Sequence, residues 1–418
     1  MADIRPSDED QGEALTVHHV TSFIYCFLAT AVGGAVSTLM SVYLPMAVKE
    51  FPGAAGATDL NTVSAYINSI FIIGWSLGGF TWGVIGDRLG RKRALVLSVV
   101  GYGIFTILTG YTTHWWMLFA CRFFSGFGVG GVLVVTATYL TEIWPARTRA
   151  VFLGFLSIAI PVGIFSAGLI NYVVAGWRQG FGVGIIPVII AVWGIWGLKE
   201  SPKWRSASAS HERTGLAELF SREHTRELLA GAVMFGTMLI GLWAIFLWTP
   251  TWIQSLLGEK DAQQQRGLSM MFLGMGGLTG GMFSGFLVNK MGARRALITC
   301  FALCALFSFI LFRTNKSFSS AVYVEIGILA LFFGASQGVL SSFIPQLFPT
   351  GIRASATGFC FNIGRLFTAT AVLFVGVMVN VLGGFGNALI IFSGVFLIGL
   401  VSVILFRTGR EPAPQPVN

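Results

Sequence analysis

Long apolar stretches occupy most of this chain, and they constrain its fold more than any other feature. Hydrophobic residues make up 54% of the sequence and charged residues only 11%, with a mean hydropathy of +0.75. A soluble globular chain carries about 25% charged residues, so this chain has more apolar surface than a soluble core can hide. The lipid bilayer must therefore be the solvent for most of it.

Short polar turns divide the apolar sequence into twelve spans, each long enough for a tilted transmembrane helix. We predict helices over residues 20–48, 61–86, 93–111, 115–143, 149–175, 179–198, 226–257, 266–289, 294–312, 320–347, 353–382 and 386–406.

The polar residues exclude several other classes of protein. The net charge is +9, but the basic residues lie in turns between spans rather than in a stripe or arm. They therefore indicate membrane topology and not a nucleic-acid partner. All five cysteines lie in apolar spans without metal-ligand spacing. No catalytic triad, metal cluster or phosphate loop is visible in the sequence, so we predict neither an enzyme nor a cofactor.

Two pairs of turns repeat along the chain at nearly the same offset. The turn 83–93 returns as 285–295, which begins 202 residues later, and the turn 142–150 returns as 346–354, which begins 204 residues later. Each half contains six spans, so the two copies have the same orientation in the membrane. This is typical of parallel repeats related by an axis along the membrane normal.

The repeat defines the predicted domains. Residues 1–198 form an N-terminal six-helix half, 199–225 a polar cytoplasmic linker, and 226–418 a C-terminal six-helix half with a short cytoplasmic tail. The predicted fold is thus an all-α membrane protein of twelve transmembrane helices, arranged as two parallel six-helix repeats.

Lysine and arginine are distributed unequally between the two sides of the membrane. If the N-terminus is cytoplasmic, 19 of these residues fall on the cytoplasmic side, six on the other side and two within spans. The six are Lys49, Arg178, Lys260, Arg266, Arg313 and Lys316. By the positive-inside rule, we predict a multi-pass protein of the plasma (inner) membrane with both termini in the cytoplasm.

Several motifs resemble one family of transporters. The turn Asp87-Arg88-Leu89-Gly90-Arg91-Lys92-Arg93 looks like the signature of the major facilitator superfamily. The runs 122–130, 142–149, 200–204 and 358–365 are similar to its branch of metabolite, aromatic-acid and sialic-acid symporters and organic-ion transporters. The resemblance implies a monomeric carrier that works by alternating access.

Charged residues at the cytoplasmic turns are candidates for a gate. A carboxylate at Asp87 can approach the N-terminus of a neighbouring helix, where free N–H groups favour negative charge. The alternative is that the basic residues only enforce topology. The predicted gating residues are Asp87, Arg88, Arg91, Glu142, Arg149 and Arg353.

Polar residues within the spans are candidates for the substrate site. Arg365 lies near the middle of span eleven, and Arg122 and Glu325 lie about two turns from the outer ends of spans four and ten. Ionisable groups at such depth usually face a cavity or a partner, although Arg122 could instead hold backbone carbonyls together. The predicted substrate-binding residues are Arg365, Arg122, Asn362, Gln337, Tyr139 and Trp243.

One departure from the resembled branch concerns coupling. Symporters for aromatic acids usually carry acidic residues in span one, whereas this span one contains no Asp or Glu. Arg122 therefore lacks its expected partner, and Glu325 is the remaining candidate for proton coupling.

These observations predict a secondary active transporter of a small organic anion, in particular a carboxylate, with H⁺ as a possible co-substrate. Two alternatives stay open. One is a neutral sugar or polyol carrier, and the other is a non-transporting membrane sensor on the same fold. Substrate identity, coupling ion and direction of transport are not encoded in these motifs.

Overall fold

The structure is a computed structural model that describes residues 15–51, 60–210, 224–258, 262–348 and 353–406. These residues form helices and connecting turns, and no β-strand occurs among them. In chain order the elements are α1 (Val17–Ala47), η2 (Val48–Glu50), α2 (Leu60–Leu89), α3 (Arg91–Thr109), α4 (Trp115–Ile143), α5 (Ala146–Ser157), α6 (Ala159–Val173), α7 (Trp177–Gly180), η3 (Phe181–Gly184), α8 (Ile185–Gly197), α9 (Pro202–Ser210), α10 (Thr225–Leu257), α11 (Gln263–Met291), α12 (Ala293–Thr314), α13 (Ala321–Gln346), α14 (Arg353–Met378), α15 (Phe385–Ser393) and α16 (Val395–Leu405).

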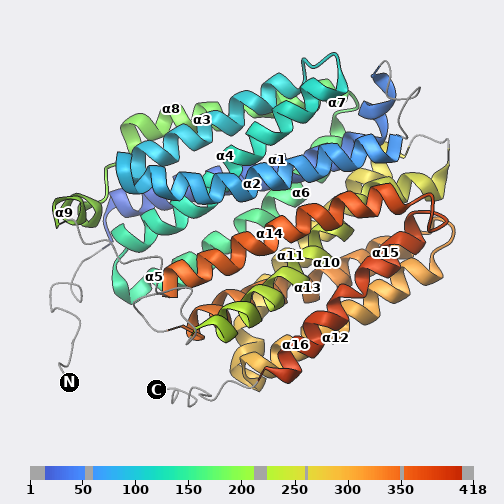
Figure 1. The fold of residues 1–418 in the computed structure, drawn as a ribbon. Coiled ribbons are helices and arrows are strands. Elements are labelled where there is room, and N and C mark those ends of the chain that lie inside the picture. Colours follow the sequence, from blue (N-terminus) through green and yellow to red (C-terminus); the bar gives the residue numbers. More distant parts are fainter. Residues whose placement is uncertain (1–14, 52–59, 211–223, 259–261, 349–352, 407–418) are drawn as a thin grey trace.

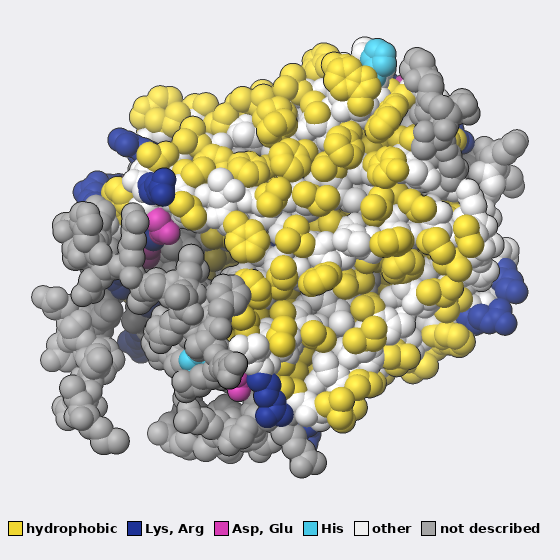
Figure 2. Space-filling view, in the orientation of Figure 1, with side chains coloured by type: hydrophobic (Ala, Val, Ile, Leu, Met, Phe, Trp, Pro, Cys, Tyr) yellow, Lys and Arg dark blue, Asp and Glu magenta, His cyan; other side chains and the backbone are white. Residues whose placement is uncertain are grey.

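Twelve helical segments in the described part of the chain are long and apolar enough to cross a membrane. Three of them are interrupted: α5 with α6, α7 through η3 to α8, and α15 with α16 each form a single span. The fold predicted from hydropathy is therefore confirmed. Hydrophobic side chains cover the flank of the bundle, while charged side chains gather at its two ends (Figure 2).

The helices form two groups, α1–α8 and α10–α16, that lie side by side (Figure 1). Because the number of spans is even, α1 begins and α16 ends at the same end of the bundle, which is called the terminal end below. The opposite end is called the far end. The two groups meet where α2 packs on α14, α6 on α11 and α1 on α10.

Equivalent turns break the helices in the two halves. Gly90 separates α2 from α3 with a φ of +99°, and Gly292 separates α11 from α12 with a φ of +80°. Glycine adopts such angles readily because it has no Cβ. The same backbone device thus occurs at repeat-related positions, as the duplicated turn motif predicts.

Glycines in α4 allow it to approach α2 closely. A Cβ added at Gly126 would lie 2.1 Å from the carbonyl oxygen of Phe71, and one added at Gly130 would lie 2.0 Å from that of Trp75. These glycines serve helix packing. Their contacts fix α2 so that Phe71 and Trp75 lie beside the centre of the bundle.

Candidate functional site

The middle of the bundle holds an aromatic and cationic group contributed by both halves. Trp75 of α2 and Trp243 of α10 meet edge to face, with ring centroids 5.0 Å apart. The Arg365 guanidinium of α14 lies 5.4 Å from the centroid of the Trp75 ring. All three residues lie about 20 Å from the ends of their helices at 1.5 Å per residue, which is the depth expected for a transporter substrate site.

Arg365 has no acidic partner among the described residues. Its Nη1 donates to the Asn362 side-chain oxygen at 3.0 Å and to the Phe361 carbonyl at 3.4 Å, both one turn away on the same helix. The residue is only partly buried. A guanidinium has five N–H donors, so Arg365 keeps donors for an anion, and Asn362 holds it in place.

Asn362 also connects α14 to the other half. Its carbonyl accepts a hydrogen bond from Ser76 of α2 at 3.0 Å, and a Cβ added at Gly79 would lie 2.8 Å from its side-chain oxygen. Asn362 is 5% exposed. It therefore positions Arg365 rather than lining an open space.

Arg122 is held by backbone carbonyls. It is 1% exposed and donates to the carbonyls of Val36 and Ser37 in α1, at 3.1 and 3.4 Å. Its guanidinium also lies 3.9 Å from the Phe71 ring centroid. Span one, which lacks an acid, thus supplies carbonyl oxygens instead, and Arg122 ties α4 to α1.

The other two predicted substrate-binding residues, Gln337 and Tyr139, have no described contact with Arg365. Gln337 lies in α13, where its amide nitrogen is buried and has no hydrogen-bond partner in the described part of the chain. Tyr139 lies one turn before the terminal end of α4, where its hydroxyl donates to the Lys199 carbonyl at 2.7 Å. Tyr139 is therefore remote from Arg365 along the bundle axis, and it packs against the segment that leads to α9.

A charge cluster lies at the terminal end of the N-terminal half. Arg91 pairs with Asp87 at 2.5 Å and with Glu142 at 2.9 Å. The Glu200 carboxylate accepts the backbone N–H groups of Arg91 at 2.7 Å and of Lys92 at 3.2 Å. Glu200 thus occupies the N-terminus of α3, where a negative charge is favoured, and Asp87 does not take that position in this conformation.

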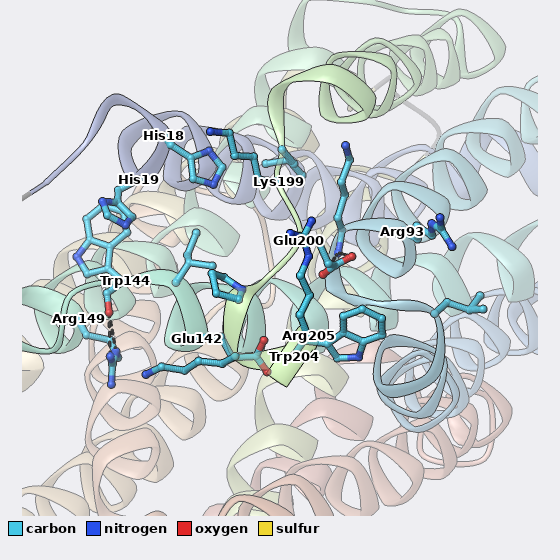
Figure 3. A pocket seen from close by; sticks show the side chains of 16 residues that line it. His18, His19, Arg93, Glu142, Trp144, Arg149, Lys199, Glu200, Trp204 and Arg205 are labelled. Carbon is cyan, nitrogen blue, oxygen red and sulfur yellow. Dashed lines mark hydrogen bonds between the residues drawn. The ribbon is translucent and has the colours of Figure 1, made fainter. Parts of the chain in front are cut away.

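This cluster borders a cavity of about 820 Å³ that is lined only by residues between 18 and 205 (Figure 3). Arg149, also on its wall, donates to the Trp144 carbonyl at 2.9 Å. Among the described contacts, Arg149 is not part of the ion pairs that join Arg91 to Asp87 and Glu142. Arg88 is exposed, and the side chain of Arg353 lies outside the described part of the chain.

Glu325 lies four residues after the start of α13 at the far end. Its carboxylate accepts a hydrogen bond from the Asn315 amide at 2.6 Å. This is about one turn from the helix start, so Glu325 lies closer to the membrane surface than the predicted two turns.

Hydrogen bonds join the two halves at the far end. Arg266 of α11, 1% exposed, donates to the Val42 carbonyl of α1 at 3.0 Å. Gln263 donates to the Asn171 carbonyl of α6 at 2.7 Å. Of the hydrogen bonds between described residues, none joins the halves at the terminal end. The described conformation is therefore closed at the far end.

Comparisons with known proteins agree with this architecture. The chain is 28% identical over 406 residues to the cis,cis-muconate transport protein of Acinetobacter baylyi, covering 94% of this chain and 95% of that protein. It is 29% identical over 323 residues to a sialic acid transporter of Escherichia coli, covering 74% and 76%. It is also 26% identical over 375 residues to a gallate transporter of Pseudomonas putida, covering 82% and 81%.

Among solved structures, the fold resembles an inward-open conformation of the xylose transporter from E. coli, with a TM-score of 0.80 at 16% identity, over 94% of this chain and 98% of that one. The sequence model of the Major Facilitator Superfamily matches residues 20–367. The chain therefore belongs to the Major Facilitator Superfamily and is a secondary transporter of the membrane.

Proposed function

We propose that this transporter moves a small organic carboxylate, which Arg365 binds at the centre of the bundle. The observation that carries the proposal is the Arg365 guanidinium beside Trp75, which has no acidic partner among the described residues. A charged group in the membrane interior is costly and usually marks a substrate or ion path. A carboxylate can satisfy a guanidinium through two parallel hydrogen bonds.

The aromatic pair supports a substrate with a flat apolar body. Trp75 and Trp243 present two rings at an angle of 77° beside the guanidinium. A planar conjugated acid could place its carboxylate on Arg365 and its body against these rings. The muconate, gallate and sialic acid relatives, which transport organic acids by name, are consistent with this class. Gln337, whose amide nitrogen has no hydrogen-bond partner among the residues that the structure describes, is the further polar candidate.

Alternating access would rock residues 1–198 against 226–406 around this site. The described conformation, closed at the far end, is one of the two states such a cycle needs. We propose that the terminal end faces the cytoplasm, so that this state opens inward, and that the protein acts as a monomer. The Asp87–Arg91–Glu142 cluster would stabilise the opposite state by meeting the other half when the terminal end closes.

We propose that this transport is coupled to protons. The candidate is Glu325, which lies near the far end and so within reach of protons outside the cell. If transport is not coupled to protons, the protein is a uniporter or an exchanger.

The direct test is uptake by proteoliposomes that contain the purified protein. Labelled carboxylates would be supplied alone and in competition with unlabelled sugars and polyols. Uptake that carboxylates inhibit and sugars do not inhibit would support the proposal. Competition by neutral sugars alone would replace it with the sugar-carrier alternative, and no ligand-dependent flux at all would favour the sensor.

A further inference from the structure

Asn68 of α2 is an amide without a partner in the interior of the bundle. The residue is 1% exposed, and neither its side-chain oxygen nor its nitrogen has a hydrogen-bond partner among the described residues. Buried polar groups in native proteins are nearly always paired. The amide of Asn68 therefore has its donors and its acceptor available for a partner from outside the chain, such as a bound substrate.

The direction of Asn68 follows from its position on the helix. It precedes Trp75 by seven residues, so at about 100° per residue the two side chains leave α2 within about 20° of each other. Along the axis Asn68 lies about 10 Å nearer the far end. It thus faces the interior, as Trp75 does, two turns beyond the ring beside Arg365.

A packed layer lies directly beyond Asn68. At Gly376 of α14, an added Cβ would lie 2.6 Å from both the Ala65 side chain and the Trp248 ring, and Ala65 is one turn from Asn68 on α2. Trp248 is held by a 3.1 Å hydrogen bond from its indole nitrogen to the Val372 carbonyl. Asn68 therefore lies between the aromatic centre and the layer that closes the bundle on the far side.

We propose that Asn68 determines specificity by binding a second polar group of the substrate, at the end remote from the carboxylate. This inference rests on the proposed function, because it takes Arg365 as the site of the carboxylate. An asparagine side chain offers both donors and an acceptor, so it fits a hydroxyl or a second carboxyl group. The contact forms as the halves move around the substrate, since the amide is sealed in the far-end-closed conformation.

The cost of leaving the Asn68 amide buried without a hydrogen bond explains why this residue would discriminate between substrates. A ligand with the remote polar group satisfies the amide, whereas a ligand without it leaves the amide buried and unpaired. Sites that hydrogen-bond a substrate group reject analogues lacking that group more strongly than apolar pockets reject extra groups. The expected preference from one such contact is about 5- to 100-fold in affinity.

Matched acids test the proposal in the full-length purified protein. Calorimetric titration would compare trans,trans-muconate with sorbate, 4-hydroxybenzoate with benzoate, and 4-hydroxycinnamate with cinnamate. Each pair differs in the remote polar group. Wild-type protein should prefer the first member of at least one pair about 5- to 100-fold, and Asn68→Leu should reduce that ratio to about one.

Asn171→Leu is the matched control, because Asn171 is also a buried amide whose side-chain atoms have no hydrogen-bond partner among the described residues, but it lies at the far end of α6. It should leave the ratio unchanged.

If Asn68→Leu does not fold, Asn68→Gln keeps the amide on a longer stem and should retain only part of the preference. The proposal fails if no pair is discriminated or bound by wild type, if Asn68→Leu keeps the wild-type ratio, or if both leucine variants change it equally. Unchanged acid binding by Arg365→Ala would instead overturn the proposed function.

Discussion

Arg91 and Glu142 form an ion pair of 2.9 Å that joins the start of α3 to the end of α4. Arg91 also pairs with Asp87, so one arginine holds two carboxylates from different helices of the same half. The Asp87 side chain is 67% exposed, whereas those of Arg91 and Glu142 are 14% and 16% exposed. Asp87 is therefore the member of the cluster that remains available to a second partner.

We predict that Asp87→Asn slows transport by about tenfold without loss of ligand binding. α2 ends and α14 begins at the terminal end, and the two helices pack together. When the halves close there, the carboxylate can approach the N-terminus of α14. Proteoliposome uptake and calorimetric binding would be measured for both proteins. Asp87→Glu, which keeps the charge, should retain more activity, and wild-type uptake in Asp87→Asn would exclude this role.

Replacing Gly90 or Gly292 by alanine should destabilise the protein to different extents. Both Gly90 and Gly292 combine a positive φ with a ψ near 155°, a conformation that costs a residue with a Cβ about 1–3 kcal/mol. At Gly90 the Cβ would also lie 2.3 Å from a Glu200 carboxylate oxygen, whereas at Gly292 nothing lies within 4 Å. Gly90→Ala should therefore lower the melting temperature more than Gly292→Ala, because it also displaces the carboxylate that caps α3. Equal melting temperatures would mean that the Glu200 cap contributes little.

Membrane orientation can be tested by cysteine labelling in a background without the native cysteines. Ser206 in α9 and Ser317 between α12 and α13 are both exposed, at opposite ends of the bundle. From the lysine and arginine asymmetry we expect an impermeant thiol reagent on whole cells to label Ser317→Cys and not Ser206→Cys. Permeabilised cells, in which both should react, provide the control. Labelling of Ser206→Cys and not of Ser317→Cys would show that the membrane orientation is opposite to the predicted one.

Coupling is tested by Glu325→Gln. If this carboxylate carries the proton, wild type should accumulate substrate when an inward proton gradient is applied, and the variant should only equilibrate it. The glutamine keeps an oxygen acceptor for the 2.6 Å hydrogen bond from Asn315, so the local structure should persist. Equal accumulation by both proteins would place the proton site elsewhere, and absence of accumulation by wild type would exclude symport.

The sequence predicts the spans well because hydropathy acts over whole helices. α4, for example, was expected over 115–143 and runs from Trp115 to Ile143. It predicts side-chain partners poorly, because they depend on how helices far apart in sequence pack. The acceptors of Arg122 are the backbone carbonyls of Val36 and Ser37. Because every residue has such a carbonyl, residue type does not predict these partners.

Glu200 shows the same limit. Its motif is visible in the sequence, but its role at the N-terminus of α3 depends on N–H groups more than 100 residues away. For Asn68, too, the sequence indicates no more than a polar residue within a span. A polar residue in a span is a weak signal until the packing shows that its amide has no partner.

Arg365 is the proposed carboxylate-binding residue, and measuring carboxylate affinity with and without its guanidinium tests this role most directly. Calorimetric titration with the tightest-binding acid would compare wild type with Arg365→Ala, Arg365→Lys and the control Arg295→Ala, which removes an exposed arginine of the same half. Removing one partner of a buried, hydrogen-bonded charge pair costs about 2–5 kcal/mol, so Arg365→Ala should weaken binding by about 30-fold or more. Arg365→Lys should recover only part of the loss, because an ammonium cannot form the two-pronged contact, and Arg295→Ala should bind as wild type does. Carboxylate binding by a folded Arg365→Ala protein at wild-type affinity would contradict the central claim.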